Sequence, residues 1–196
     1  SRFLFEKGVV DKDFLLRITS YYHAYESGHL DIYEYEAFLL QPLANYPLPQ
    51  ITEWRAEFLQ QVQQAIRPEL AEQVKNFREL EFILVLITAS NSFIAEPIAK
   101  LLNFPNLICT QIKKENGRFT TQIDRIPAFQ DGKVQRLKNW LSKHNLTLEG
   151  SWGYSDSHND LPLLRLVKNP IAVFPDPILR AYANQHGWQI ISQESG

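Results

Sequence analysis

The fold is decided by residues 82–92, which read Phe82-Ile83-Leu84-Val85-Leu86-Ile87-Thr88-Ala89-Ser90-Asn91-Ser92. Six consecutive apolar residues, mostly branched, predict a strand covered on both faces, as in a parallel sheet. The polar run that begins at Thr88 ends this strand, and a helical pattern continues through Ile94, Ile98 and Leu101. A buried strand followed at once by a helix is typical of α/β folds.

The alternation of strands and helices continues to the end of the chain. An extended stretch begins at Leu107, and Asn116-Gly117 predicts a hairpin turn before a further strand at 118–123. Helices are predicted from Asp131-Gly132-Lys133 and over 177–186, with strands at 151–155, 171–174 and 188–191. From residue 68 onward, the pattern predicts a doubly wound α/β domain with a parallel sheet.

The first third of the chain has a different character. Residues 1–8 read as an amphipathic helix ending at Gly8, and residues 9–66 read as helices with no candidate strand. Asp11 and Asp31 are helix-start signals, and Gly28 is a stop signal. A loop is predicted at 46–49, because a residue before proline favours extended geometry, and a third helix from Ile51 to about Ile66. We therefore predict a helical lobe at 1–67 and an α/β core at 68–196.

Composition and charge narrow the function classes. The net charge of −2 and the absence of a Lys/Arg cluster give no electrostatic case for a nucleic-acid partner. A single cysteine, Cys109, excludes an internal disulfide and fits a reducing compartment. No apolar run approaches the length of a membrane span, and no signal peptide is visible. We expect a cytoplasmic protein without a membrane partner.

The segment Tyr154-Ser155-Asp156-Ser157-His158-Asn159-Asp160 is the best candidate for a metal site. It follows a predicted strand, where open α/β sheets place ligands. Asp156 and Asp160 supply hard oxygen ligands, which suit Mg²⁺. The alternative is that Asp156, Ser157 or Asn159 caps the next helix.

Two further groups complete the candidate site. Thr88 and Ser90 lie between a strand and a helix, where a hydroxyl and free N–H groups favour an anion. Lys133, near a helix start, could place a positive charge over the same crevice. The alternatives are simple helix capping for the hydroxyls and a solvated surface position for the lysine. Phosphoryl transfer needs this combination of positioning and charge neutralisation.

Together these motifs resemble a known family. Leu-Ile-Thr88-Ala-Ser, Asp-Gly-Lys133 and Tyr-Ser-Asp156-Ser-His-Asn-Asp160 are similar to motifs two, three and four of the haloacid dehalogenase superfamily of phosphatases. The segment from Thr88 to Ala99 is close to its subfamily IB, which includes phosphoserine phosphatase-like and histidinol-phosphatase-like enzymes. The resemblance implies a Rossmann-like core and a helical cap of the C1 type at 1–67.

The resemblance also implies roles for single residues. Thr88 would bind the substrate phosphoryl group, helped by N–H groups around Ala89, Ser90 and Asn91. Lys133 would neutralise the phosphoryl charge. Asp156 would hold Mg²⁺ directly, whereas Asp160 would support the metal or its waters and orient Lys133. Members of this family form a covalent phosphoaspartate, which splits one hard displacement into two easier ones.

One family motif is absent from the sequence. The nucleophile belongs to a first motif, Asp-x-Asp-x-Thr, on a strand ahead of the cap, and no such motif occurs in residues 1–196. Asp11 and Asp13 are nearby acidic residues, but they start a cap helix and follow no apolar strand. We therefore expect a truncated phosphatase that lacks the first strand of its sheet and has little activity as given.

Two functional hypotheses follow. The first is an Mg²⁺-dependent phosphomonoesterase acting on a small phosphorylated metabolite, with histidinol phosphate and phosphoserine as the candidates that the resemblance implies. The second is a non-catalytic relative that binds a phosphorylated ligand or a partner protein. A homo-oligomer that fills the gap in the sheet is a third, weaker idea, since an unpaired strand edge invites pairing.

Overall fold

A computed structural model describes residues 1–115 and 118–192. The chain divides into two compact units, residues 1–127 and 128–196, and each unit is described by itself. The predicted turn at Asn116-Gly117 lies outside the described residues. Within the described part of the chain, no helix is long and apolar enough to cross a membrane.

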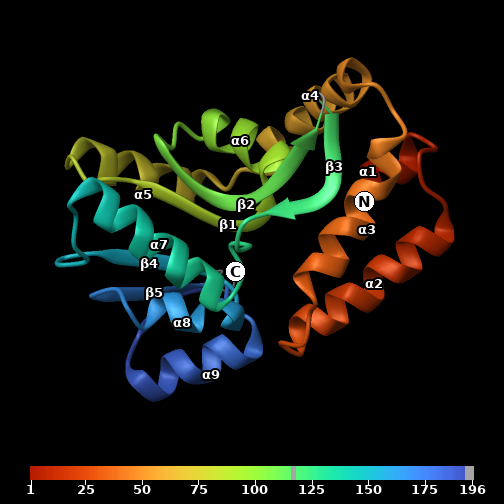
Figure 1. Ribbon diagram of the computed structural model, residues 1–196. Helices are drawn as coiled ribbons and strands as arrows, with labels where there is room; N and C mark the ends of the chain where they lie inside the picture. The colour runs from red at the N-terminus through yellow and green to blue at the C-terminus, as the bar shows by residue number, and fades with distance from the viewer. Residues whose placement is uncertain (116–117, 193–196) are drawn as a thin grey trace. The chain divides into compact units, whose positions relative to one another are not determined.

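The first unit begins with five helices (Figure 1). They are α1 (Arg2–Glu6), α2 (Lys12–Glu26), α3 (Ile32–Ala44), α4 (Leu48–Gln64) and α5 (Pro68–Glu79). The predicted start signals are confirmed: Asp11 accepts the Phe14 N–H at 2.8 Å, and Asp31 accepts the N–H groups of the first turn of α3. This capping satisfies N–H groups that have no partner inside a helix.

The loop predicted at 46–49 is shorter in the structure. Helix α4 begins at Leu48 instead of Ile51, and Pro47 is its extended N-cap residue. Pro49 is tolerated because N–H groups in the first turn of a helix have no intrahelical acceptor. The proline rule that placed these residues in a loop therefore gave the wrong helix start.

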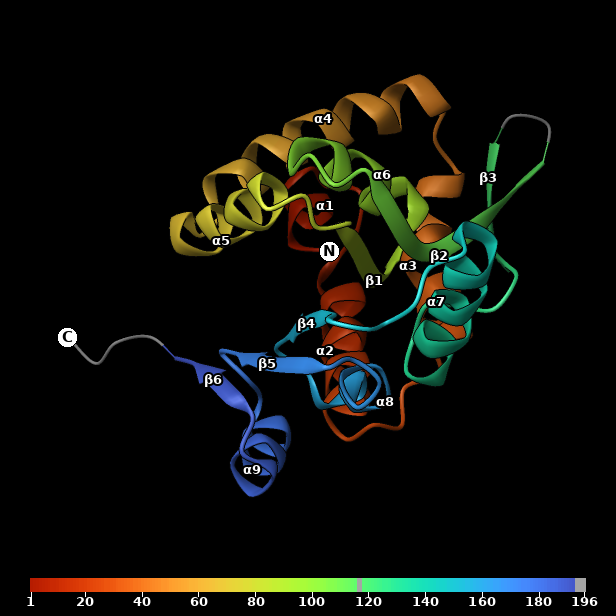
Figure 2. The same cartoon turned by 90° about the vertical axis from the view of Figure 1, so that its left-hand side faces the viewer.

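The sheet of the first unit holds β1 (Val85–Asn91), β2 (Asn106–Glu115) and β3 (Arg118–Asp124) in that order. Strand β1 is parallel to β2, and β2 is antiparallel to β3. Helix α6 (Ser92–Leu101) lies beside β1 and β2 in both ribbon views (Figures 1 and 2). The strand–helix unit predicted around residues 82–101 is thereby confirmed.

The predicted burial of the first strand on both faces is wrong. Phe82 and Ile83 are 41% and 57% exposed and precede β1, and residues 84–88 are only half-buried. The physical reason is that, among the described residues, β1 is paired with β2 alone. An edge strand shares only one side with a neighbour and is therefore less covered than a central strand.

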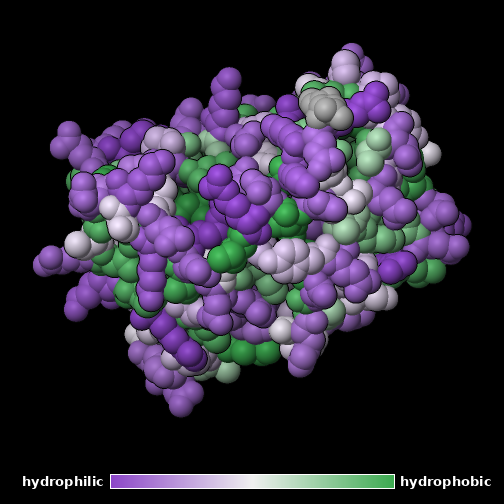
Figure 3. All heavy atoms as spheres, in the orientation of Figure 1, coloured by the Kyte–Doolittle hydropathy of each residue, from purple (hydrophilic) through white to green (hydrophobic). Residues whose placement is uncertain are grey.

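Each unit has a small hydrophobic core of its own. In the first unit, Leu40, Ile51, Phe93 and Ile112 are buried together, which joins α3, α4, α6 and β2. In the second, Leu164, Ala172, Leu179 and Ala183 form the buried cluster. Hydrophilic side chains cover most of the molecular face drawn in Figure 3, with hydrophobic side chains visible between them.

The second unit is a parallel α/β arrangement. Its strands are β4 (Trp152–Ser155), β5 (Asn169–Val173) and β6 (Gln189–Ile191), and both strand pairs are parallel. Its helices are α7 (Asp131–His144), the 3₁₀ turn η1 (His158–Asp160), α8 (Leu161–Leu164) and α9 (Pro177–His186). Gly153 permits close packing, because an added Cβ would lie 2.9 Å from the Val167 side chain.

The predicted α/β class with a helical N-terminal segment is confirmed by these elements. The predicted division at residue 67/68 into cap and core remains a prediction.

Candidate functional site

The loop after β1 is shaped by an irregularity in the sheet. Thr88 pairs with Cys109 and Asn91 with Thr110, so Ala89 and Ser90 are extra residues without ladder partners. Such a bulge disrupts the ladder locally and re-aims side chains. Four of the five predicted phosphate-binding residues, Thr88–Asn91, therefore lie on one distorted strand end, directly before α6, and the fifth is Lys133.

Thr88 folds this loop back on itself. Its Oγ1 accepts the Ser90 N–H at 3.1 Å, a local turn that Thr and Ser hydroxyls commonly make. The hydroxyl proton of Thr88 is not used in this contact and can be donated to an anion. The Ser90 N–H, in contrast, already has an acceptor, so it is less available to a phosphate than the sequence suggests.

Asn91 is held by a residue that the sequence analysis missed. Its Nδ2 donates to Oε2 of Glu36 on α3 at 2.8 Å, and the two residues are 7% and 2% exposed. Burial raises the pKa of Glu36 to about 7, although the hydrogen bond from Asn91 lowers it. A sequence signal existed: Glu36 stands between Ile32 and Leu40 at helical spacing, on the buried face of α3.

Lys133 and Asp160 form a buried ion pair in the second unit. Lys133 Nζ lies 2.6 Å from Asp160 Oδ1, and the side chains are 8% and 12% exposed. The surface position weighed for Lys133 is therefore wrong. The second carboxylate oxygen of Asp160 accepts the Ser155 hydroxyl at 2.7 Å. The two contacts fix Asp160 and aim the lysine.

Asp156 differs sharply from Asp160. Its residue is exposed, and its carboxylate makes no hydrogen bond or ion pair within residues 1–115 and 118–192. The Asp156 backbone is nevertheless fixed, because its carbonyl accepts the Asp176 N–H at 2.8 Å. Asp156 is thus a free carboxylate on an anchored loop.

The rest of this loop is held by its own polar groups. Ser157 caps η1 by accepting the Asn159 N–H, which confirms the capping alternative for this residue. Asp176 accepts the N–H and Nδ1 of His158 at 2.6 and 2.8 Å. Burial would raise the pKa of Asp176, but hydrogen bonds from Leu179 and His158 bring it below its usual range. Sequence reasoning missed Asp176 because it is 18 residues away from His158, its partner in this loop.

The predicted site residues therefore fall into two groups. Thr88, Ala89, Ser90 and Asn91 lie together in the first unit. Lys133, Asp156 and Asp160 belong to the second, where the ion pair joins α7 to the loop after β4.

The donor set fits Mg²⁺ at Asp156. No group of three or more His, Cys, Asp or Glu side chains suited to a metal occurs in the described ranges. Mg²⁺ does not require one, because it binds through one or two carboxylates and keeps water and substrate phosphate as its other ligands. Asp156 offers such a carboxylate, whereas both oxygens of Asp160 are engaged by Lys133 and Ser155.

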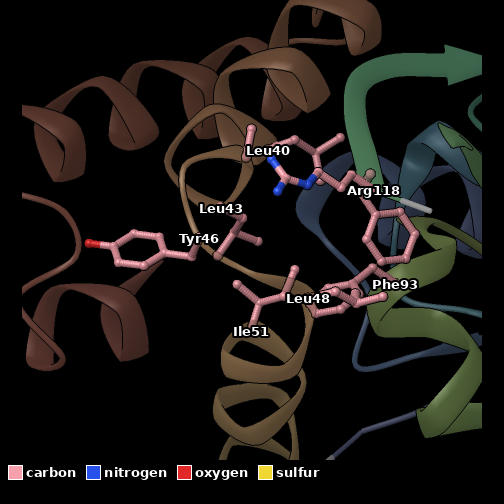
Figure 4. Close-up of a pocket in the computed structure, with 9 residues that line it drawn as sticks. Leu40, Leu43, Tyr46, Leu48, Ile51, Phe93 and Arg118 are labelled. Carbon is pink, nitrogen blue, oxygen red and sulfur yellow. The ribbon is translucent and has the colours of Figure 1, made fainter. Parts of the chain in front are cut away.

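A pocket elsewhere in the first unit is lined by none of the predicted residues. It has an empty volume of about 380 Å³, including space open to solvent. Leu40, Ile51 and Phe93 of the buried cluster contribute to its wall. Figure 4 shows the Arg118 side chain extending from β3 toward Leu40, while the Tyr46 ring points away. The pocket is an opening in the packing of α3, α4, α6 and β3.

Comparison with known proteins identifies the family. The family model described as haloacid dehalogenase-like hydrolase matches residues 2–165. The chain belongs to this family. The predicted superfamily and hydrolase class are thereby confirmed, and the haloacid dehalogenase-like fold agrees with the α/β elements described above.

The similar proteins match either nearly the whole chain or about half of it. A histidinol-phosphatase of Neisseria meningitidis serogroup C is 34% identical, over 97% of this chain and 89% of its own length. A phosphoserine phosphatase of Mycobacterium tuberculosis is 33% identical, but over 54% of this chain and 34% of its own length.

Solved structures support the same fold. A protein of unknown function from Bordetella pertussis Tohama I superposes with a TM-score of 0.88 at 33% identity, covering 97% of this chain and 88% of that chain. A substrate-bound phosphoserine phosphatase superposes with a TM-score of 0.69 at 15% identity, covering 96% and 83%. The second likeness concerns the fold alone.

Proposed function

We propose that this haloacid dehalogenase-like protein is an Mg²⁺-dependent phosphomonoesterase of small phosphorylated metabolites. The observation that carries the proposal is the loop after β4, where a buried Lys133–Asp160 pair accompanies the exposed, unpaired carboxylate of Asp156. Charge neutralisation of a phosphoryl group requires a fixed cation such as Lys133 and a free carboxylate that can hold Mg²⁺.

The residues have separate roles in this proposal. Lys133, oriented by Asp160, neutralises charge on the phosphoryl oxygens. The Thr88 hydroxyl donates a hydrogen bond to a phosphoryl oxygen. The backbone around Ala89 and Asn91 positions the phosphoryl group. Asp156 would hold Mg²⁺, with Asp160 acting on the metal only through its waters. When bound, Mg²⁺ supplies Lewis-acid stabilisation of the phosphoryl charge.

The nucleophile is not among residues 1–196. We propose the covalent route of the family: an aspartate carboxylate attacks phosphorus and breaks the P–O ester bond, so that the substrate alcohol leaves with a proton, and water then hydrolyses the phosphoaspartate to release inorganic phosphate and restore the aspartate. No Asp-x-Asp-x-Thr occurs in these residues, and Asp11 is occupied as the N-cap of α2. We therefore expect the 196 residues alone to bind phosphate but to hydrolyse esters at no more than a background rate.

For the substrate, we propose histidinol phosphate ahead of phosphoserine. The support is the histidinol-phosphatase relative, which matches over 97% of this chain, whereas the phosphoserine phosphatase relative matches over 54%. A cytoplasmic location without nucleic-acid or membrane partners goes with this proposal, in keeping with the net charge of −2 and with a single, buried cysteine, Cys109. We further propose a homo-oligomer in which a second copy of the chain pairs with the edge of β1 that has no partner strand among the described residues.

A second candidate is a protein that binds a phosphorylated ligand without hydrolysing it. Both candidates bind phosphate, but only the phosphomonoesterase hydrolyses a phosphate ester.

The deciding experiment is phosphate release with Mg²⁺ from histidinol phosphate, phosphoserine and p-nitrophenyl phosphate. The 196-residue chain and the full-length product of its gene are assayed side by side, with Asp156→Asn as the control. Mg²⁺-dependent release by the full-length product, lost in Asp156→Asn, is the expected result. Folded full-length protein that binds phosphate but releases none from any ester would favour the binding protein.

A further inference from the structure

Glu36 is a buried carboxyl group that the proposed mechanism does not use. It lies on α3, far in sequence from the loop after β1, yet its Oε2 accepts from Asn91 Nδ2 at 2.8 Å. In its ionised form the Glu36 carboxylate only accepts hydrogen bonds, and in the structure Asn91 presents its amide nitrogen to this acceptor on α3. The orientation of the Asn91 side chain is thereby set by Glu36.

Asn91 occupies the N-cap position of α6 but does not cap it. An asparagine at this position usually accepts the N–H of the second or third helical residue through its side-chain oxygen. Here no side-chain cap bond is made, and Asn91 Oδ1 is buried without a hydrogen-bond partner in the described structure. A buried, unpaired acceptor costs free energy, so some feature must hold the side chain away from the helix end. The bond to Glu36 does so.

The helix end is left open as a result. Phe93 and Ile94 are the second and third residues of α6, and their N–H groups receive no cap from Asn91. Uncapped N–H groups at a helix start, with the positive end of the helix dipole, favour a phosphoryl anion. Thr88, with a hydroxyl proton to donate, lies on the same loop.

We propose that Glu36 is a positioning residue for phosphate: by holding the Asn91 amide, it keeps the Phe93 and Ile94 N–H groups available to the phosphoryl group. The inference rests on the proposed function, since it assigns a further residue to the same phosphate-binding loop. A merely structural role, in which Glu36 only ties α3 to β1, makes different predictions for double variants.

The test is calorimetric titration of the 196-residue chain with inorganic phosphate in Mg²⁺. In Glu36→Leu, the released Asn91 side chain caps α6 and competes with phosphate, so affinity falls about fivefold to tenfold, the equivalent of one N-cap bond. Glu36→Gln retains an acceptor oxygen and binds phosphate like the parent. Glu36→Leu/Asn91→Ala has no side chain left to cap the helix, and its affinity recovers to within about twofold of the parent.

A second measurement needs no ligand. Amide hydrogen exchange at Phe93 and Ile94 slows in Glu36→Leu, because the new cap protects these N–H groups, and is unchanged in Glu36→Gln. If Glu36→Leu does not fold, Glu36→Ala provides the same comparison with a smaller side chain.

The outcomes separate the inference from the proposed function. Suppose the parent binds phosphate but the double variant recovers no affinity, or exchange at Phe93 and Ile94 does not slow. Glu36 is then only structural, and the inference is overturned while the proposed function stands. A folded parent that binds no phosphate in Mg²⁺ overturns both.

Discussion

Lys133 and Asp160 lie 2.6 Å apart with both side chains nearly excluded from water. A buried ion pair adds little net stability compared with apolar residues, but removing one partner leaves an uncompensated charge. The pair therefore serves mainly to fix the position of the lysine. Its rupture by removal of one partner is expected to lower the free energy of unfolding.

We expect Lys133→Met to lower the free energy of unfolding by about 3 kcal/mol or more, because Asp160 is left buried and unpaired. Adding Asp160→Asn to this variant recovers most of the loss, since no charge then remains. Urea denaturation of the parent, both single variants and the double variant gives the coupling energy. Equal stability of Lys133→Met and the double variant would show that Asp160 is solvated without its partner.

Glu36 gives the protein a pH-dependent stability. Burial raises its pKa from 4.5 to about 7, so the folded state binds this proton more tightly than the unfolded state does. Stability from this group is fully present below about pH 4.5 and is lost as the pH rises to about 7.

Between pH 5 and pH 8, we expect the parent to lose roughly 2 to 3 kcal/mol of unfolding free energy more than Glu36→Gln, which has no proton to release. The comparison of the two proteins by urea denaturation cancels the titration of all other groups. Parallel pH profiles would mean that Glu36 ionises normally in the folded protein.

At the scale of single elements, Asp176 does two tasks at the start of α9. It caps the helix by accepting the Leu179 N–H at 2.7 Å, and it holds the His158 N–H and ring of the loop after β4. Asp11 performs the capping task alone on α2, in an exposed setting. The two residues form a matched comparison.

We expect Asp11→Ala to cost about 1 kcal/mol, the usual value of an N-cap, and Asp176→Ala about 2 kcal/mol or more, because the His158 N–H also loses its acceptor. Thermal denaturation of both variants gives the two values. Equal losses would show that the contact with His158 contributes nothing to stability.

Local signals explain which elements could be predicted from sequence. Asp11, Asp31 and Pro177 mark helix starts through chemistry confined to one turn, and the structure has these helices in place. The start of α4 was misplaced because Pro49 is compatible with a first helical turn. The burial of Phe82 and Ile83 was overestimated because coverage depends on neighbouring strands, which the sequence of one strand does not specify.

At the scale of the whole molecule, periodicity was sufficient for the α/β class, and motif spacing for the family. The contacts that define the candidate site were harder to predict from the sequence. Glu36 meets Asn91, and Asp176 meets His158, across long sequence separations. The helical spacing of the apolar residues around Glu36 indicated that it is buried. No feature of the sequence indicated that its hydrogen-bond partner is Asn91.

The proposed function depends on phosphate binding that requires Mg²⁺ held by Asp156. The most direct measurement is titration of the 196-residue chain with inorganic phosphate, with Mg²⁺ and with chelator, for the parent and Asp156→Asn. We predict binding by the parent in Mg²⁺ that weakens about tenfold or more in chelator and equally in Asp156→Asn, because the carboxylate and the metal act together. Asp156→Asn should remain folded, since its side chain is exposed and unpaired in the described structure. Phosphate binding that is as strong in Asp156→Asn, or in the parent with chelator, as in the parent with Mg²⁺ would contradict the proposed function, and so would no binding by the folded parent.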